Sequence, residues 1–428
     1  MNIRTTALSP RIARPAKLLA LCLALLCAGT LTGCGGFFQA ITTTTTNTGT
    51  GYDIVYVGRN STNEFAGYQV LSTGLTAVTG SPFSISSPPL SMAITPTNSY
   101  LYVGTATAIY GYSIAAGGVL TALNSGSSMA VQPSNLAPVS TMDISPDGDW
   151  LVVMNDIGGT ISVLTYAINV TTGALTPTTA AITQFPLPTT NSTQTSNATS
   201  SVALGVKFSP DEKSQTNSVL VASLGTGGQK TFLFNSTSGL VSEADLLQQT
   251  TATNVSNNAA IWTADSTTLY FARSIGTSGV VSYPVSTTAG TFTNTASNAP
   301  STGNNPTAIT FNSSQSYLYA VNSADNTVTG YKVATSSGST TLTTLSGSPY
   351  LTSSIGPDAI AFDNSDNYIL VMSQAGPPDL VQFTIDGVTN TSTTTPGRLY
   401  VTSSVTTPLT NGVAIGTLGS GITMVTTH

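Results

Sequence analysis

The chain has 428 residues, of which only 7% are charged, and its 11 basic and 17 acidic side chains give a net charge of −6. This acidic balance argues against nucleic acid or anionic lipid headgroups as partners, because both carry negative charge themselves. The low charge and the abundance of Thr, Ser, Asn and Gly suit strands and turns and do not suit long helices.

The N-terminal 33 residues have the pattern of a bacterial secretion signal. Four basic residues precede an apolar run, Leu18–Ala28, which is short for a membrane span but typical of a signal peptide. The run is followed by LTGC (31–34), which resembles the lipobox of bacterial lipoproteins. In that family the signal is cut before the Cys, which then carries lipid. We therefore expect removal of residues 1–33 and a lipid anchor on Cys34; the alternative is a soluble secreted protein with a chance Cys.

The segment after the expected cleavage site, residues 34–51, is rich in Gly and Thr and predicts a flexible tether. Gly35 stands where an Asp would indicate retention in the inner membrane. The resemblance therefore implies the outer membrane of the cell envelope, facing the periplasm or the cell surface. Apart from Cys34 no thiol would remain, so no disulfide or thiol nucleophile is expected.

From residue 52 onward the chain repeats one unit, in which a short strand, a polar turn and a second apolar strand follow one another. The segment SMAITPTNSYLYVG (91–104) aligns in this way with TMDISPDGDWLVVMN (141–155). In six copies the first strand ends at an apolar residue: Ile94, Ile144, Phe208, Trp262, Phe311 and Phe362. The turn SPDGDW (145–150) is thus a repeated hinge between strands, and its aspartates are not repeated in the other copies.

A third strand follows each pair and carries an aromatic residue near its middle. The seven copies are Tyr68, Tyr112, Tyr166, Phe234, Tyr283, Tyr331 and Phe383. A weaker fourth strand follows a Gly-containing turn in several copies. Four antiparallel strands in each repeat predict the blades of a β-propeller.

The two ends of the repeat region complement each other. The chain enters through 52–57, which reads as a second strand with no first strand before it, and NGVAIGT (411–417) reads as a first strand. We therefore predict an all-β fold, residues 52–428, with seven four-stranded blades and a ring closed by pairing of the N- and C-terminal strands. The final segment, GITMVTTH (421–428), has no place in this scheme. Tyrosines of the second strands are expected to pack blade against blade.

The phrase SPDGDWLVVMN, followed by a strand and a TG-containing turn, resembles the lactonase-type seven-bladed propellers. That family includes bacterial 6-phosphogluconolactonase and the fungal carboxy-muconate cyclase, and its copies resemble the YVTN surface-layer repeats. The resemblance implies lactone chemistry, which the fungal cyclases perform with a His, a Glu and an Arg around the channel mouth. No internal histidine is available here, because the one histidine of the chain is His428.

The connections after strand two and the connections between blades open on the same face of such a ring, which we call the mouth face. Residues expected just after strand two are Arg59, Gly104, Asn155, Ser223, Arg273, Asn322 and Ser373. The loops between blades would add Asn257, Asn258, Asn305, Asp358 and Asn411. We predict a ligand site formed by Arg59, Asn155, Arg273, Asn322 and Asp358, for a carboxylate, a phosphate or a sugar. The alternative is that these side chains cap turns and pair locally.

Two charged residues, Asp143 and Lys207, fall in first strands, which line the central channel of a propeller. Each of them either faces the channel or pairs with a neighbour. A lactone hydrolase without a histidine base would need a carboxylate base and a cation for the oxyanion, for which Asp143, Lys207 and Arg273 are the candidates. DNSDN (363–367) lacks the Gly and distal Glu of a calcium loop and is better explained as a solvated turn. No metal or cofactor is expected.

Three functions are compatible with this sequence. The first is an envelope-anchored binding or interaction scaffold, with a carbohydrate, a lactone or a protein as ligand at the mouth. The second is a hydrolase of sugar-acid lactones, similar to 6-phosphogluconolactonase. The third is a structural protein of the envelope.

Overall fold

The computed structural model describes residues 53–131, 138–178, 182–187, 201–210, 217–247, 256–274, 279–292, 297–336, 339–388, 395–405 and 422–428. They all belong to the second of two compact units, residues 49–428. The expected signal peptide, the expected lipidation site Cys34 and the whole predicted tether, residues 34–51, lie outside the described residues. Within the described ranges, no helix has the length and apolarity needed to cross a membrane.

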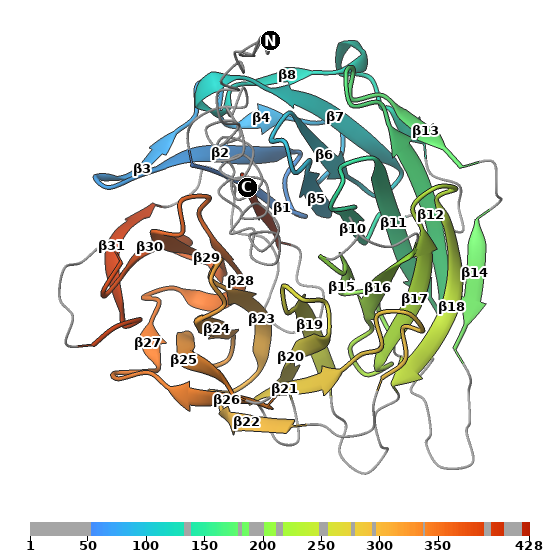
Figure 1. Ribbon diagram of the computed structural model, residues 1–428. Helices are drawn as coiled ribbons and strands as arrows, with labels where there is room; N and C mark the ends of the chain where they lie inside the picture. Colours follow the sequence, from blue (N-terminus) through green and yellow to red (C-terminus); the bar gives the residue numbers. More distant parts are fainter. Residues whose placement is uncertain are drawn as a thin grey trace, which may run out of the picture. The chain divides into compact units, whose positions relative to one another are not determined.

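The second unit is a ring of seven antiparallel blades, as predicted (Figure 1). Blade 1 contains β32 (Ile422–Thr426), β1 (Ile54–Arg59), β2 (Glu64–Leu71) and β3 (Gly74–Ala77), with the short β4 (Phe83–Ser84) beside β2. Blade 2 contains β5 (Ser91–Ile94), β6 (Tyr100–Gly104), β7 (Ala108–Ile114) and β8 (Leu120–Ala122), with β9 (Ala130–Val131) beside β7. Blade 3 contains β10 (Thr141–Ile144), β11 (Trp150–Ile157), β12 (Thr160–Ile168) and β13 (Leu175–Pro177), with β14 (Thr183–Pro186) beside β12.

The other four blades follow the same order. Blade 4 contains β15 (Gly205–Phe208), β16 (Asn217–Ser223), β17 (Gln229–Asn235) and β18 (Leu240–Leu247). Blade 5 contains β19 (Ser256–Trp262), β20 (Thr268–Ser274), β21 (Gly279–Pro284) and β22 (Ser297–Ser301). Blade 6 contains β23 (Pro306–Phe311), β24 (Tyr317–Asn322), β25 (Thr327–Ser336) and β26 (Ser339–Thr344), with β27 (Tyr350–Leu351) beside β25. Blade 7 contains β28 (Ile355–Phe362), β29 (Tyr368–Ala375), β30 (Leu380–Ile385) and β31 (Leu399–Val405). The described helices are two 3₁₀ turns, η1 (Ala116–Gly118) and η2 (Asn124–Gly126).

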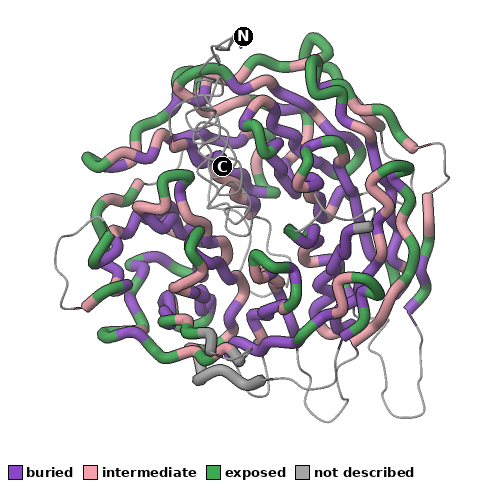
Figure 2. Tube along the Cα trace, in the orientation of Figure 1, coloured by how far each residue is buried: buried purple, intermediate pink, exposed green. Residues whose placement is uncertain are grey.

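The first strand of every blade lies at the axis of the ring. Each of these inner strands contacts the inner strand of the next blade, and the series returns from β28 through β32 to β5. The second strands are almost wholly buried between the blades, whereas the outer strands and turns carry most exposed residues (Figure 2). The hydrophobic core therefore lies between neighbouring blades, because a single sheet cannot bury both of its own faces.

The ring is closed by a different segment from the one that the sequence suggested. Strand β32 pairs with β1, from Val55 opposite Thr426 to Arg59 opposite Ile422. Two hydrogen bonds extend the pairing by one residue. The Ile54 amide donates to the Thr427 hydroxyl, and the Thr427 amide donates to the Ile54 carbonyl, each at 3.0 Å. The prediction that 411–417 closes the ring is wrong, and that segment lies outside the described residues. Both segments are short and apolar, so their pattern alone did not distinguish them.

The aromatic of the third strand is also misassigned in blade 4. In blade 2, Tyr112 lies opposite Leu101, which in turn pairs with Ile94 at the end of the first strand. The same register in blade 4 leads from Phe208 through Leu220 to Phe232, not to Phe234. A shift of two residues leaves both side chains on one face of the strand, so alternation could not reveal it.

A recurring hydrogen bond joins neighbouring blades at five of the seven junctions of the ring. A hydroxyl of one blade donates to the carbonyl of a glycine in the turn before the fourth strand of its neighbour. The five pairs are Tyr56 to Gly118, Tyr102 to Gly173, Thr165 to Gly239, Thr231 to Gly290 and Tyr319 to Gly397, at 2.5 to 2.9 Å. These glycines have φ between 67° and 83°, where only glycine is free of strain. The expectation that the tyrosines of the second strands pack between blades is confirmed.

Candidate functional site

The mouth face of blades 5, 6 and 7 carries the same backbone irregularity three times. In each inner strand the register with the second strand shifts by one residue, which leaves one extra residue as a β-bulge. The extra residues are Asn258 in β19, Thr307 in β23 and Asp358 in β28. Bulges bend a strand and turn one side chain in a new direction, and they are common beside functional sites. We call these three residues the bulge cluster.

The members of the bulge cluster link three neighbouring blades. The Asn258 amide donates to the Pro306 carbonyl of blade 6 at 2.8 Å and to the Ser274 hydroxyl at 3.0 Å. The Thr307 hydroxyl donates to the Pro357 carbonyl of blade 7 at 3.3 Å and also lies within hydrogen-bonding reach of the Asp358 carboxylate. These contacts hold a carboxylate, a hydroxyl and an amide side by side near the axis.

Asp358 is the charged member of the bulge cluster. It is mostly buried, and burial among the inner strands raises its pKa, while hydrogen bonds from Thr307 and Gln374 oppose that rise. None of the three ion pairs among the described residues involves Asp358. A carboxylate surrounded by a hydroxyl and amides, without a cation, is suited to accept hydrogen bonds from hydroxyl groups.

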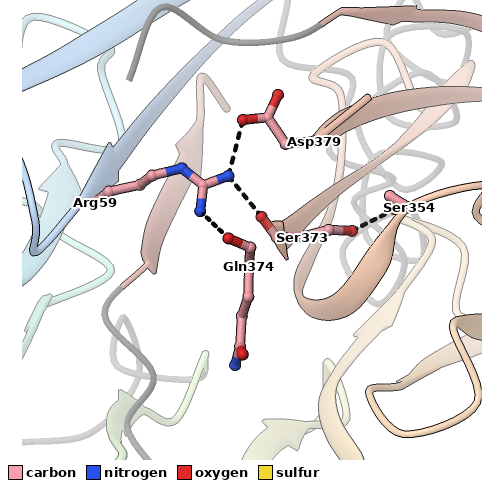
Figure 3. Close-up of polar contacts among 5 residues, drawn as sticks. All are labelled: Arg59, Ser354, Ser373, Gln374 and Asp379. Atoms are coloured by element: carbon pink, nitrogen blue, oxygen red, sulfur yellow. Dashed lines mark hydrogen bonds and ion pairs between the residues drawn. The ribbon is translucent and has the colours of Figure 1, made fainter. Parts of the chain in front are cut away.

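Arg59 does not line the mouth, although the sequence suggested it as a ligand-binding residue. Its side chain is 2% exposed and crosses from blade 1 to blade 7 (Figure 3). It donates to the Ser373 carbonyl and forms an ion pair with Asp379, both at 2.8 Å, and it also donates to the Gln374 carbonyl. The backbone of Gln374 faces Arg59 while its side-chain amide points away, which leaves that amide for Asp358 (Figure 3). Arg59 therefore supports the bulge cluster from behind.

Arg273 occupies the same blade position as Arg59 but has different partners. Each arginine lies four residues beyond the second-strand residue that pairs with the third-strand aromatic. Arg273 is partly exposed, and it donates to the side-chain Oδ1 atom of Asn257 at 2.8 Å and to the Tyr283 hydroxyl at 3.1 Å. Its partners belong to blade 5, whereas those of Arg59 belong to blade 7. The structure therefore does not bring the two guanidinium groups into one site.

The remaining predicted amides are buried at the mouth face. Asn155 accepts from the Ser140 hydroxyl at 2.7 Å, and Asn322 donates to Thr327 and Thr329 at 3.0 and 2.8 Å. Asn257 is also buried, and its side-chain oxygen accepts the hydrogen bond from Arg273. Among the described residues, the Nδ2 atoms of Asn155 and Asn257 and the Oδ1 atom of Asn322 have no hydrogen-bond partner. Buried polar atoms rarely stay unpaired, so these three positions favour bound water or ligand atoms at the mouth face.

The other sequence candidates lie elsewhere or differ in register. The equivalents of Arg59 in blades 2 and 4 are Thr105 and Leu224, one residue beyond the expected Gly104 and Ser223. Asn305 precedes β23, and Asn411 lies outside the described residues. Asp143 and Lys207 form an ion pair of 3.2 Å near the opposite end of the inner strands. Asp363 accepts hydrogen bonds from the amides of Asn367 and Tyr368 in its own turn.

The bulge cluster was missed because the sequence placed Asn258 and Asp358 in loops between blades and passed over Thr307. A signal was present in the three inner strands. Each bulged residue is polar and is followed by Ala and then by another apolar residue, in NAA (258–260), TAI (307–309) and DAI (358–360). The inner strands that carry this pattern have six to eight residues, whereas those of blades 2 to 4 have four. The shared pattern is therefore the sequence signal of the bulge.

Comparisons with known proteins agree with the geometry. Residues 229–349 match a family model described as Lactonase, 7-bladed beta-propeller. A solved protein from Lactobacillus plantarum is 17% identical with a TM-score of 0.63, and the comparison covers 88% of this chain and 99% of that one. The periplasmic gluconolactonase of Pseudomonas aeruginosa is 16% identical, with a TM-score of 0.63 and the same coverage. A candidate 6-phosphogluconolactonase from Bacteroides fragilis is 16% identical, with a TM-score of 0.61 over 88% of this chain and 98% of that one.

No curated protein matches the chain in sequence. Identities this low establish the fold and not the chemistry. The predicted resemblance to lactonase-type seven-bladed propellers is confirmed, and the activity of each relative remains a statement about that relative.

Proposed function

We propose that this lactonase-like seven-bladed propeller is a binding scaffold of the bacterial envelope, anchored through Cys34, whose mouth face holds a hydroxyl-rich ligand such as a carbohydrate. The observation that carries the proposal is the row of three bulges that presents Asn258, Thr307 and Asp358 on adjacent inner strands. Carboxylate, amide and hydroxyl groups held rigidly together match the donors and acceptors of a sugar.

The arrangement favours binding over hydrolysis. A carboxylate base needs a cation or another strong donor beside the oxyanion that forms during lactone hydrolysis. Arg59, one of the two arginines expected at the mouth, is committed to Asp379 and two backbone carbonyls behind the cluster. A ligand at Asp358 would therefore meet hydrogen-bonding groups, in a site stiffened by contacts between blades, while Arg59 is not free to stabilise an oxyanion.

Lactone hydrolysis is the second candidate function, and two observations favour it. The match of residues 229–349 is to a lactonase model, and the raised pKa of Asp358 is the kind of shift that general bases show. If hydrolysis occurs, Asp358 would accept the proton of the attacking water and Arg273 would be the remaining arginine on that face. A structural envelope protein without a small ligand is the third possibility.

An oligosaccharide array with the lipid-free protein, residues 34–428, tests the proposal. The proposal predicts saturable binding of at least one neutral glycan, weakened roughly tenfold by Asp358→Asn, because a charge-assisted hydrogen bond contributes about 1.5–3 kcal/mol. Lys332→Met is the matched control, since Lys332 is exposed on β25 and far along the sheet from the inner strands. Binding that is equal in Asp358→Asn and wild type would place the ligand elsewhere and contradict the proposal.

A further inference from the structure

A second group of ionisable side chains lies near the axis at the end opposite the mouth face. Asp143 and Lys207 are the penultimate residues of inner strands β10 and β15, and His428 follows inner strand β32. The inner strands β32, β5, β10 and β15 are consecutive neighbours in the ring. We call Asp143, Lys207 and His428 the turn-end cluster, because the turns between first and second strands lie at this end.

His428 is fixed in place through its backbone. The His428 amide donates to the Asn98 side-chain oxygen at 2.7 Å, and the Asn98 side-chain amide donates to the His428 carbonyl at 2.6 Å. Asn98 is 2% exposed and lies in the turn between β5 and β6 with φ of 56°. The two reciprocal bonds hold the end of the ring-closing strand, and with it the backbone of His428, against blade 2.

The Lys207 ammonium is the accessible charge of the turn-end cluster. Asp143 uses one carboxylate oxygen for Lys207 Nζ at 3.2 Å and the other for the Phe208 amide at 2.9 Å. The carboxylate is thus held by the backbone of the next blade, and its side chain is 19% exposed against 56% for Lys207. An ammonium group has three donors, so Lys207 can donate to a further oxygen while it keeps Asp143.

The imidazole of His428 complements this ammonium. His428 is exposed on one side, yet desolvation by the neighbouring strands lowers its pKa and the charge of Lys207 lowers it further, while a hydrogen bond to the Ile94 carbonyl and the charge of Asp143 raise it. A pKa below its usual value favours the neutral imidazole near pH 7, in which one N–H donates to Ile94 and the second nitrogen carries no proton. An anion beside it would favour protonation, and the second nitrogen would then become a donor.

We propose that the turn-end cluster is a second binding site, separate from the bulge cluster, for a small ligand with an anionic oxygen group, either a carboxylate or a phosphate. Lys207 is the one Lys or Arg on the described inner strands, in a chain with an acidic balance. Lys207 is therefore the one basic side chain of the described inner strands with which an anion near the axis can pair. Lys207 and, after proton uptake, His428 donate to the anion, while Asp143 positions Lys207. The site does not depend on a ligand at the mouth face.

The single histidine of the chain provides a direct probe, because its imidazole signals in an NMR spectrum need no assignment. Inorganic phosphate and gluconate are titrated separately into the ¹⁵N-labelled lipid-free protein, residues 34–428, with potassium chloride at equal ionic strength as the control. We expect a saturable shift of the His428 signals with at least one of the two anions and none with chloride. Phosphate and gluconate then distinguish the two sources of the anionic group.

Three variants test the assigned roles. Lys207→Met should weaken anion binding roughly tenfold or more and raise the pKa of His428, because the ammonium that disfavours the imidazolium is gone. Asp143→Asn should lower that pKa for the opposite reason. Lys332→Met removes the same charge from an exposed position on β25 and should change neither. The far-ultraviolet circular dichroism spectrum confirms that each variant is folded.

The proposal is overturned if neither anion produces a saturable shift of His428, or if Lys207→Met binds as tightly as Lys332→Met. A shift that depends only on ionic strength and appears equally with chloride would also overturn it.

Discussion

The ion pair between Arg59 and Asp379 offers the sharpest test of how this propeller is held closed. Arg59→Met keeps most of the side-chain volume but removes three hydrogen bonds, one of them to a carboxylate that is 0% exposed. Breaking a buried pair by removing one partner costs about 3–5 kcal/mol, because the remaining charge stays buried. We therefore expect Arg59→Met to lower the free energy of unfolding by that amount.

The measurement is urea unfolding followed by circular dichroism and by the fluorescence of Trp150 and Trp262. Arg273→Met is the matched control, because Arg273 occupies the equivalent position in blade 5 but is partly exposed and bonds only to neutral groups. Its loss should cost about 1–2 kcal/mol. The double variant Arg59→Met/Asp379→Leu should be more stable than the sum of the single changes predicts, by at least about 1 kcal/mol.

A different result would refute the structural role assigned to Arg59. If Arg59→Met costs less than about 1 kcal/mol and yet abolishes ligand binding, the guanidinium is available to ligand and the buried arrangement is incorrect. If the effects of the single changes are simply additive, the two side chains are not coupled.

Three further predictions concern the contacts between blades. Tyr319→Phe removes the hydroxyl that donates to Gly397 at 2.7 Å and should cost about 1 kcal/mol or more in urea unfolding, with Tyr317→Phe as the control; equal losses would contradict the role of the hydroxyl. Gly239→Ala should lower the free energy of unfolding by more than about 2 kcal/mol, because φ is 69° and a Cβ would lie 2.2 Å from the Trp150 ring. Gly126→Ala is the control, since φ is 79° and a Cβ would have nothing within 4 Å. It should cost only the backbone strain of about 1–2 kcal/mol. Burial and the neighbouring Asp53 raise the pKa of Asp363 to about 6, above 3.8, so the folded state binds this proton more tightly than the unfolded chain. Stability should therefore rise as the pH falls from about 6 toward 4, and Asp363→Asn, which resembles Asn312 in blade 6, should flatten that rise; an unchanged pH profile would show that Asp363 does not carry it.

The repeat could be read from the sequence because each blade repeats one apolar frame. The ends of the first strands at Ile94 and Phe362, and the aromatic at Tyr112, are confirmed by their pairing. Alternation of apolar residues fixes which face a side chain takes, but a shift of two residues preserves it, so Phe234 was chosen over Phe232. The closing strand was missed for a related reason, since two short apolar segments fitted the same place.

The candidate site was harder to predict than the fold. The prediction that Arg59 and Arg273 occupy equivalent blade positions is confirmed. The partners of each side chain, however, depend on the neighbouring blade. Blade 7 offers Asp379 and two carbonyls to Arg59, whereas Arg273 finds partners within blade 5. Bulges are local irregularities that the spacing of apolar residues does not display, which is why Thr307 was overlooked.

The most direct test of the central claim is the hydrolysis of D-glucono-1,5-lactone, followed as proton release at constant pH with the wild-type chain and with Asp358→Asn. If the mouth face binds its ligand without hydrolysing it, as proposed, neither protein hydrolyses the lactone faster than buffer. Turnover by the wild type that Asp358→Asn abolishes would contradict this account and establish the bulge cluster as a hydrolytic site.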